Sequence, residues 1–340
     1  MIYQLLALAT VLIVISPEPA KGEKDFNRYL YKSEIGFFNK IIYLILMILI
    51  FFGGIYTLKS KFTGKSDVYA VGGWIIRFIY KMPMVLVLMF AIFLISYYAK
   101  YKKINVQLIL VTAVALIVIT IYSGERDFLF RFLLIVLISF WFLEKINLKH
   151  LIILCPVLLA TLPLSTIYKY YFIRGTRTMY KDNIIHSIFA AEFESAATNL
   201  QIVLNHSSST NGMLGFKQII YDIAGGFFSD IQSTGALFNQ MYYSNSRYVQ
   251  YGFSLVGEGY FIAGALGVVV LFILVGLIVK FFFLYHRQNI YTVASYFYFI
   301  TLVIYSIRGD FSVIIAGLVK QIGVVVIVLY FFEKLSKKHM

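Results

Sequence analysis

The sequence predicts an all-α polytopic membrane protein with about nine transmembrane helices and a large extracytoplasmic helical loop. Three observations lead to this fold class: the composition, the length of the apolar runs and the position of the basic clusters. Of the 340 residues, 60% are hydrophobic and 14% are charged, and the mean hydropathy is +0.82. Soluble domains contain roughly 45–50% apolar and about 25% charged residues, so lipid is the solvent expected for most of this chain.

The apolar runs are the elements of this fold. A spanning helix needs about 20 residues, because about 30 Å of hydrocarbon is crossed at 1.5 Å per residue. Nine runs cover approximately residues 2–16, 39–58, 74–98, 104–122, 128–144, 149–172, 255–284, 290–307 and 311–333. The first run is short, and we interpret it as a retained helix because no Lys or Arg precedes it and Ser16-Pro17 is a poor cleavage site.

The basic clusters predict the orientation of these spans. If the lysines at 334, 337 and 338 lie in the cytoplasm, alternation of the spans puts the basic segments 21–32, 100–103, 144–149 and 285–289 on the same side. The lysines at 59, 61 and 65 oppose this orientation, since they then fall in a short external loop. The chain is therefore expected to be a multi-pass membrane protein, with residues 172–253 on the external side of the membrane.

This organisation divides the chain into three parts. Residues 1–172 hold the first six helices, residues 173–253 form the extracytoplasmic loop, and residues 254–340 hold the last three helices. A structureless loop of that length is improbable, so it should be folded. Apolar residues at helical spacing predict an amphipathic helix over 183–204, and the glycines at 215, 225, 226 and 235 favour short helices at the membrane surface beyond it.

The composition also excludes several classes of site. The formal charge of +14 sits in short clusters beside the apolar runs, so we expect no nucleic-acid partner. The single cysteine, Cys155, permits neither a disulfide nor a thiolate cluster within the chain. None of the five histidines has a histidine four residues away, and we expect neither a metal site nor a cofactor.

Charged residues at the external ends of spans are the candidate functional groups, because a charge that slips to the bilayer centre costs about 2.5–3.5 kcal/mol. Arginine binds oxyanions bidentately and stays ionised, so a group of arginines there predicts a clamp for a lipid-linked diphosphate. The alternative is that each arginine anchors its helix to lipid head groups. The candidates are Arg126, Arg174, Arg177, Arg247 and Arg308.

Three carboxylates and a group of tyrosines accompany these arginines. Glu258 opens the seventh span in a glycine-rich stretch, and Asp127 and Asp310 follow Arg126 and Arg308 in two short turns. Glu258 is either a salt-bridge partner of an arginine or a catalytic group. Tyr242, Tyr243 and Tyr248 lie before the seventh span and are candidates for sugar binding, although such tyrosines more often form an interfacial belt.

Together these motifs resemble the oligosaccharide repeat unit polymerases of the Wzy type. The resemblance rests on Ser-Gly-Glu-Arg-Asp at 123–127, the large external loop, Gly-x-Ser-x-x-x-Glu-x-Tyr-x-x-x-Gly-x-x-Gly from 252 to 267, and Arg-Gly-Asp at 308–310. It covers essentially the whole chain in layout. It implies an integral membrane glycosyltransferase with a GT-C-like architecture that joins lipid-linked repeat units of O-antigen, the outer part of lipopolysaccharide, or of capsule.

The resemblance also implies partners and roles. The substrates would be undecaprenyl-diphosphate-linked oligosaccharides as donor and acceptor, within membrane lipid, and a chain-length regulator protein would be a further partner. Arg126, Glu258 and Arg308 correspond by motif and Arg174 by position only. The arginines would stabilise charge on the departing diphosphate, and Glu258, or failing it Asp127 or Asp310, would take the proton of the acceptor hydroxyl. One direct displacement predicts inversion at the anomeric carbon.

Two other functions remain open at this point. An O-antigen ligase would require an essential loop histidine, His186 or His206, in place of Arg308. A flippase or transporter of lipid-linked sugars, which is not an enzyme, would place ionisable groups at mid-bilayer, whereas those of this sequence lie mainly at span ends.

Overall fold

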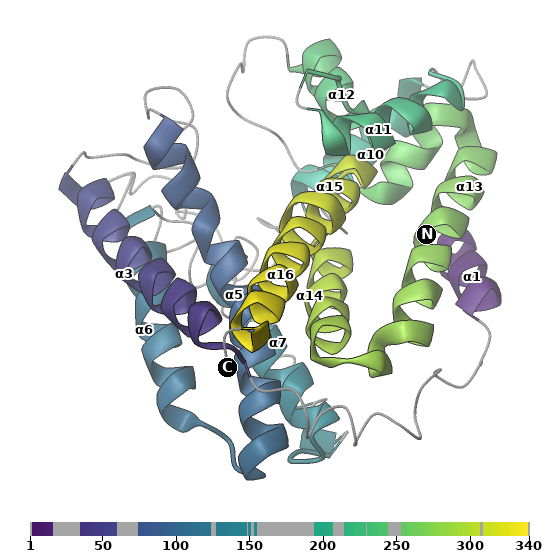
Figure 1. Ribbon diagram of the computed structural model, residues 1–340. Coiled ribbons are helices and arrows are strands. Elements are labelled where there is room, and N and C mark those ends of the chain that lie inside the picture. The colour runs from purple at the N-terminus through teal and green to yellow at the C-terminus, as the bar shows by residue number, and fades with distance from the viewer. Residues whose placement is uncertain are drawn as a thin grey trace. The chain divides into compact units, whose positions relative to one another are not determined.

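The computed structural model describes residues 2–15, 35–59, 74–123, 127–147, 149–150, 153–154, 194–206, 214–228, 230–243, 253–306 and 309–338. Helices make up almost all of these ranges, which contain no strand (Figure 1). The described part of the chain is therefore all-helical with long apolar helices, as the sequence predicts for its fold class. The described residues form two compact units.

One unit comprises residues 24–190, 289–301 and 324–340. Its helices are α3 (Phe37–Lys59), α5 (Trp74–Tyr101), α6 (Val106–Ser123), α7 (Asp127–Phe142), the first part of α14 (Ile290–Ser306) and α16 (Val324–Lys338). The core is the middle of α5, where Leu86 to Ala91 are all buried because α3, α6 and α7 pack around it. A helix that is apolar on every side packs in this way.

The other unit comprises residues 1–23, 191–288 and 302–323. It contains α1 (Ile2–Ile15), α10 (Glu194–His206), α11 (Lys217–Phe227), α12 (Thr234–Tyr242), α13 (Leu255–Tyr285), a 3₁₀ turn η4 (His286–Gln288), the end of α14, α15 (Phe311–Ala316) and a π-helical segment η5 (Gly317–Gly323). Helix α1 lies along α13, and α11 lies along α15. We call this the carboxylate unit, because its buried acids form the site described below.

Three of the described helical segments are long and apolar enough to cross a membrane: Lys81–Tyr101, Leu255–Gln288 and Phe311–Leu335. Shorter apolar helices occupy Phe37–Gly53, Val106–Thr120 and Ile290–Ser306. Helices thus coincide with eight of the nine runs in the sequence. The sixth run, 149–172, lies almost wholly outside the described residues, and the total of about nine spans stays a prediction.

Helix α13 differs from the single continuous span that the sequence suggests for 255–284. Its backbone breaks at Ala263 and Gly264, and Gly264 has φ +60 and ψ −146, which an L side chain rarely adopts. At the break the chain passes so close to itself that a Cβ on Gly267 would overlap the carbonyl oxygen of Gly259. Residues 265–285 remain long enough to cross about 30 Å of hydrocarbon.

The segment before the break belongs to a small helical cluster. Phe253 and Phe261 pack with Phe238 of α12 and Val203 of α10, and all four are buried. The ring centroids of Phe238 and Phe253 are 4.5 Å apart in a stacked arrangement. The break also leaves the carbonyl of Ile262 free to accept a hydrogen bond of 2.8 Å from the backbone N–H of Gly215. Of the amphipathic helix predicted over 183–204, the described part is α10.

A candidate carboxylate site

The carboxylate unit brings together three acidic side chains from three different helices. Asp222 lies in α11, Glu258 in the first turn of α13, and Asp310 directly before α15. Asp222 and Glu258 are fully buried, and the charges of Glu258, Asp310 and Asp222 act on one another. Buried carboxylates are rare unless they are held by hydrogen bonds, so the contacts of each decide what it can do.

Asp310 is the N-cap of α15, a position that aspartate favours because its oxygens accept from free helical N–H groups. Its Oδ1 accepts from the backbone N–H of Val313 at 3.1 Å and from the hydroxyl of Ser312 at 2.7 Å. Its Oδ2 accepts from the hydroxyl of Ser233 at 2.9 Å, and Ser233 is itself the N-cap of α12. Asp310 therefore links the first turns of two helices.

Glu258 reaches the same helix terminus from α13. Its Oε2 accepts from the backbone N–H of Phe311 at 2.7 Å, and the side chain is 0% exposed. Its Oε1 is also buried and meets no donor among the described residues. One oxygen of this carboxyl is thus fixed in place, while the other has unused capacity to accept a hydrogen bond.

Asp222 is held at the N-terminus of α12. Its Oδ1 accepts from the backbone N–H of Thr234 at 2.6 Å, and its Oδ2 accepts from the Thr234 hydroxyl at 2.5 Å. Burial raises the pKa of Asp222 from its ordinary value of 3.8 to about 6, although the hydrogen bonds from Thr234 oppose that rise. The charge of Asp310 raises the pKa further, and the neighbouring Glu258 carboxyl lowers it. Asp222 is therefore a buried acid whose pKa lies above that of an ordinary aspartate.

The cluster is stabilised by helix termini. Within the described ranges, no lysine or arginine forms an ion pair with Asp222, Glu258 or Asp310, whose partners are the N–H and hydroxyl groups at the start of α12 and α15. The positive end of a helix dipole favours negative charge at that position. Space is also tight, because a Cβ on Gly235 would overlap Oδ2 of Asp310.

The predicted site residues fall into four groups, the last of which is Tyr242 with Tyr243. Glu258 and Asp310 come together in the carboxylate unit. Asp127, the first residue of α7, is half-buried and belongs to the other unit. The five predicted arginines and Tyr248 lie outside the described residues, namely Arg126, Arg174, Arg177, Arg247, Arg308 and Tyr248.

Tyr242 and Tyr243 contact the protein itself. Their rings lie 4.8 Å and 6.1 Å from the ring of Phe238, and the Tyr243 hydroxyl donates to Oδ1 of Asn199 at 2.7 Å. Both side chains are half-buried against the aromatic cluster of α10, α12 and α13. Their role in sugar binding stays a prediction, and these contacts give both residues a packing role.

Asp222 is the member of the cluster that sequence reasoning missed. A signal was present, because Gln218, Asp222 and Gly226 recur every four residues and so share one face of a helix, opposite Ile220 and Ile223. A polar face on an apolar helix is a reason to look for a buried polar contact. The described residues contain no group of three His, Cys, Asp or Glu side chains that could hold a metal ion.

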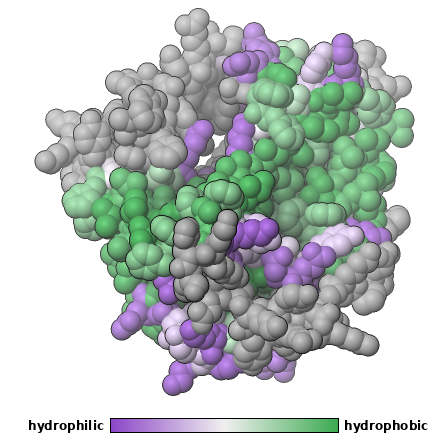
Figure 2. Space-filling view, viewed as in Figure 1, coloured by the Kyte–Doolittle hydropathy of each residue, from purple (hydrophilic) through white to green (hydrophobic). Residues whose placement is uncertain are grey.

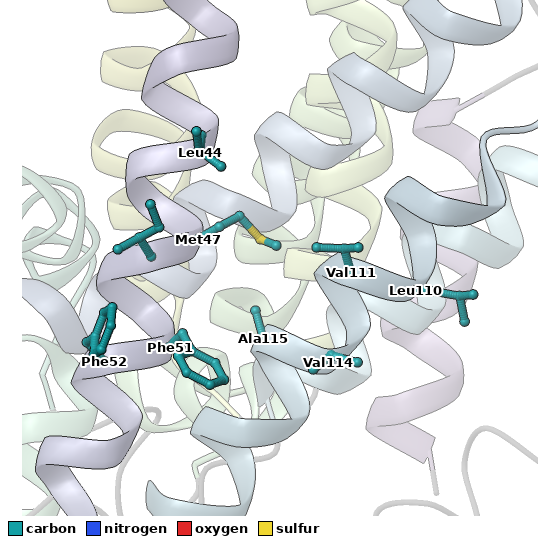
Figure 3. Close-up of a pocket in the computed structure, with 9 residues that line it drawn as sticks. Leu44, Met47, Phe51, Phe52, Leu110, Val111, Val114 and Ala115 are labelled. Carbon is teal, nitrogen blue, oxygen red and sulfur yellow. The ribbon is translucent and has the colours of Figure 1, made fainter.

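The other unit carries a groove of about 420 Å³ between α3 and α6. In Figure 3, Met47 and Phe51 of α3 point toward α6, where Val111 and Ala115 complete the wall. Every residue that lines this groove is apolar, so it offers no group for acid, base or anion chemistry. The carboxylate cluster is therefore the stronger candidate for a reaction site.

Comparison with known proteins gives no family assignment. The chain matches no protein-family model, no curated protein and no solved structure.

Proposed function

We propose that this protein is a membrane glycosyltransferase of the Wzy type, which joins undecaprenyl-diphosphate-linked repeat units into O-antigen or capsular polysaccharide. The reaction would take place at the outer face of a bacterial cytoplasmic membrane. Two features support the proposal: the motifs at 123–127, 252–267 and 308–310, and the hydrogen bond that Glu258 of the second motif accepts from Phe311, the residue that follows the third motif.

The observation on which the proposal depends is the state of the Glu258 carboxyl. Its Oε2 is fixed by the N–H of Phe311, and its buried Oε1 receives no hydrogen bond from the described residues. A general base needs a free oxygen at a fixed place, within about 2.6–3.2 Å of the hydroxyl that it deprotonates. Because Glu258 is fully buried, the proposal requires that substrate binding opens a path to Oε1.

In the proposed reaction a hydroxyl oxygen of the acceptor repeat unit forms a bond to the anomeric carbon of the donor glycan. The bond from that carbon to the diphosphate oxygen breaks, and its electron pair leaves with undecaprenyl diphosphate. The hydroxyl proton passes to Glu258, with Asp310 and Asp127 as the alternative acceptors. This single displacement inverts the anomeric centre.

Arginines would stabilise the charge that develops on the diphosphate. Arg308 precedes Asp310 by two residues in the sequence, and Arg126 precedes Asp127. Removal of one charge-stabilising donor from an active site typically costs on the order of 10² to 10³ in rate. Arg174, Arg177 and Arg247 are further candidates on the same side of the predicted topology.

The glycans of a strain that lacks this gene test the proposal. Loss of a polymerase should leave a single repeat unit on the lipid core, and the wild-type gene should restore the ladder. Long glycans that accumulate on the undecaprenyl carrier would instead identify a ligase. A complete absence of glycan from the outer face would identify a flippase, and either result would refute the proposal.

A transporter of lipid-linked sugars is the second candidate, and the broken helix α13 favours it. Discontinuous helices with a buried ionisable residue near the break are typical of secondary transporters. Glu258 is five residues before the break at Ala263 and Gly264, and it contacts Asp222. Uptake of a labelled lipid-linked oligosaccharide into protein-containing vesicles, driven by a proton gradient and without lengthening of the glycan, would support this candidate.

A further inference from the structure

Helix α11 is amphipathic, but its polar face is buried and its apolar face is exposed, the reverse of a helix on the surface of a soluble domain. The side chains of Gln218 and Asp222 are buried, and with Gly226 they form a stripe at every fourth residue. The opposite stripe is apolar and exposed: Phe216, Ile220, Ile223, Phe227 and Phe228 have exposed fractions of 47%, 65%, 37%, 49% and 64%. We call these five side chains the α11 apolar face. In water such a helix would turn its apolar side inward.

The neighbours of α11 indicate what covers this face. The helix packs on α15 and η5, which begin the membrane-crossing segment Phe311–Leu335. The packing is close, because a Cβ on Gly226 would lie 2.5 Å from Cγ2 of Ile315. A helix in such contact with the first turns of a membrane span lies at the level of the bilayer.

The direction of α11 follows from two contacts. Asp222 is held beside Glu258, which binds the N–H of Phe311, and Gly226 meets Ile315. The step from Asp222 to Gly226 along α11 therefore runs beside the step from Phe311 to Ile315 along α15, so the two helices are parallel. The C-terminal end of α11, with Phe227 and Phe228, thus points along the span toward the bilayer interior.

The two ends of α11 suit different depths. At its start Lys217 is exposed and its Nζ lies 5.5 Å from the ring centre of Tyr221. Lysine and tyrosine side chains are common at the level of lipid head groups, whereas phenylalanine and isoleucine suit the acyl chains. Exposed apolar side chains continue on the neighbouring helices, with Val313 on α15 and Leu266 on α13, and Figure 2 shows hydrophobic surface over the flank that α13 forms.

We propose that the α11 apolar face is embedded in the bilayer leaflet at which the last span begins, so that its partner is lipid hydrocarbon. With 11 residues at 1.5 Å each, α11 is about 16 Å long, which is too short to cross about 30 Å of hydrocarbon. This inference does not depend on the proposed function. It places the carboxylate cluster on the inner side of a helix whose outer side contacts lipid.

Spin-label accessibility tests this placement. Cys155→Ala provides a background without native cysteine, and nitroxide labels are attached at Ile220→Cys, Ile223→Cys and Phe227→Cys in full-length protein reconstituted into phosphatidylcholine–phosphatidylglycerol vesicles. Gln201→Cys on α10 and Gln240→Cys on α12 are polar, exposed controls, and Leu277→Cys on α13 is the lipid reference. Collision rates are measured with oxygen, which enters lipid, and with a water-soluble nickel chelate.

At the three α11 positions we expect the ratio of the oxygen to the nickel collision rate to match that of Leu277→Cys. It should exceed that of both polar controls several-fold. A ratio like that of the polar controls would show that water covers the face. Immobile labels that neither reagent reaches would show that a second copy or another protein covers it. Either result overturns the inference. Three separate labelled positions keep the test decisive if one variant fails to fold.

Discussion

Two buried glutamates, one in each unit, have opposite surroundings. Glu333 of α16 is 7% exposed, and its Oε2 accepts a hydrogen bond from the hydroxyl of Tyr291 on α14. Asn39 of α3 donates to the carbonyl of Leu329 on the same helix α16, at 3.2 Å. Glu258 is 0% exposed, its neighbours are the carboxyls of Asp222 and Asp310, and its Oε1 has no donor among the residues described.

The difference separates a structural acid from a candidate reactive one. A buried carboxylate that meets donors from neighbouring helices stabilises their packing, as Glu333 does for α14 and α16. Neighbouring like charges and a buried acceptor without a donor both lower the stability of the fold. Proteins tend to keep such arrangements where the group is functional. Substitutions in each unit, with activity and stability measured separately, test that distinction.

Among substitutions of the residues around Glu258, the largest effect is expected for Asp310→Asn. Asparagine is as good an N-cap as aspartate and can still accept from Val313, so the fold should persist. The negative charge is lost from the cluster, and repeat-unit polymerisation should fall by about 10²-fold, the scale of a group that acts in proton transfer. Asp230→Asn, which changes an exposed acid of the same unit, is the matched control and should keep wild-type activity. Equal rates for the two variants would remove Asp310 from the site.

A smaller loss is expected for Gly235→Ala. The added methyl group would overlap Oδ2 of Asp310, so the carboxyl must move. A misplacement of about 1 Å can cost up to about 10² in rate, and we expect a loss of about 10-fold. Gly276→Ala adds the same methyl group elsewhere in the unit, 3.1 Å from Cβ of Val14, and should leave the rate unchanged. Wild-type activity in Gly235→Ala would mean that the position of Asp310 is unimportant.

Asp222 should make stability depend on pH. Folded Asp222 releases its proton near pH 6, and an ordinary aspartate does so near 3.8, so between these values the folded state holds more protons than the unfolded state. Stability should therefore fall as pH rises through this window and then level off. A shift of this size corresponds to about 3 kcal/mol. Asp222→Asn should flatten the dependence in thermal unfolding measured from pH 4 to 7, and an unchanged slope would contradict the assignment of this titration to Asp222.

Glu333→Gln should affect stability more than activity. The amide keeps an acceptor for the Tyr291 hydroxyl but brings an N–H₂ group into a buried site, which should cost about 1–2 kcal/mol in the free energy of unfolding. Polymerisation at a temperature where the variant is folded should remain near the wild-type rate. A large loss of rate without a loss of stability would mean that the second unit also contributes a reactive acid.

The sequence alone predicts the positions of the helices and part of the carboxylate site. Apolar runs located the helices because lipid-exposed and buried positions are both apolar in such a chain. Glu258 and Asp310 stood out since they are acids at the ends of apolar runs. The sequence does not predict that these acids lie close to each other and to Asp222. The hydrogen bond from Phe311 to Glu258 joins residues 53 apart, and that from Thr234 to Asp222 joins residues 12 apart. Such contacts depend on tertiary packing and leave no local pattern.

The break in α13 shows the same limit. The run from 255 to 284 is apolar throughout, so its hydropathy predicts one helix. The close approach of Gly259 and Gly267 is decided by the left-handed conformation of Gly264, which glycine permits but does not require. The glycines therefore mark where a break is possible, and the packing of Phe253 and Phe261 on Phe238 selects it.

The rate of glycan lengthening by Glu258→Gln is the most direct test of the proposed site. Purified protein in lipid would receive synthetic undecaprenyl-diphosphate-linked repeat units, and Glu333→Gln would be measured beside it. Glutamine keeps an oxygen for the N–H of Phe311 but cannot take a proton, so Glu258→Gln should be slower than wild type by about 10² or more while Glu333→Gln stays within a few-fold. Equal rates in the two variants would contradict the assignment of Glu258 as the base.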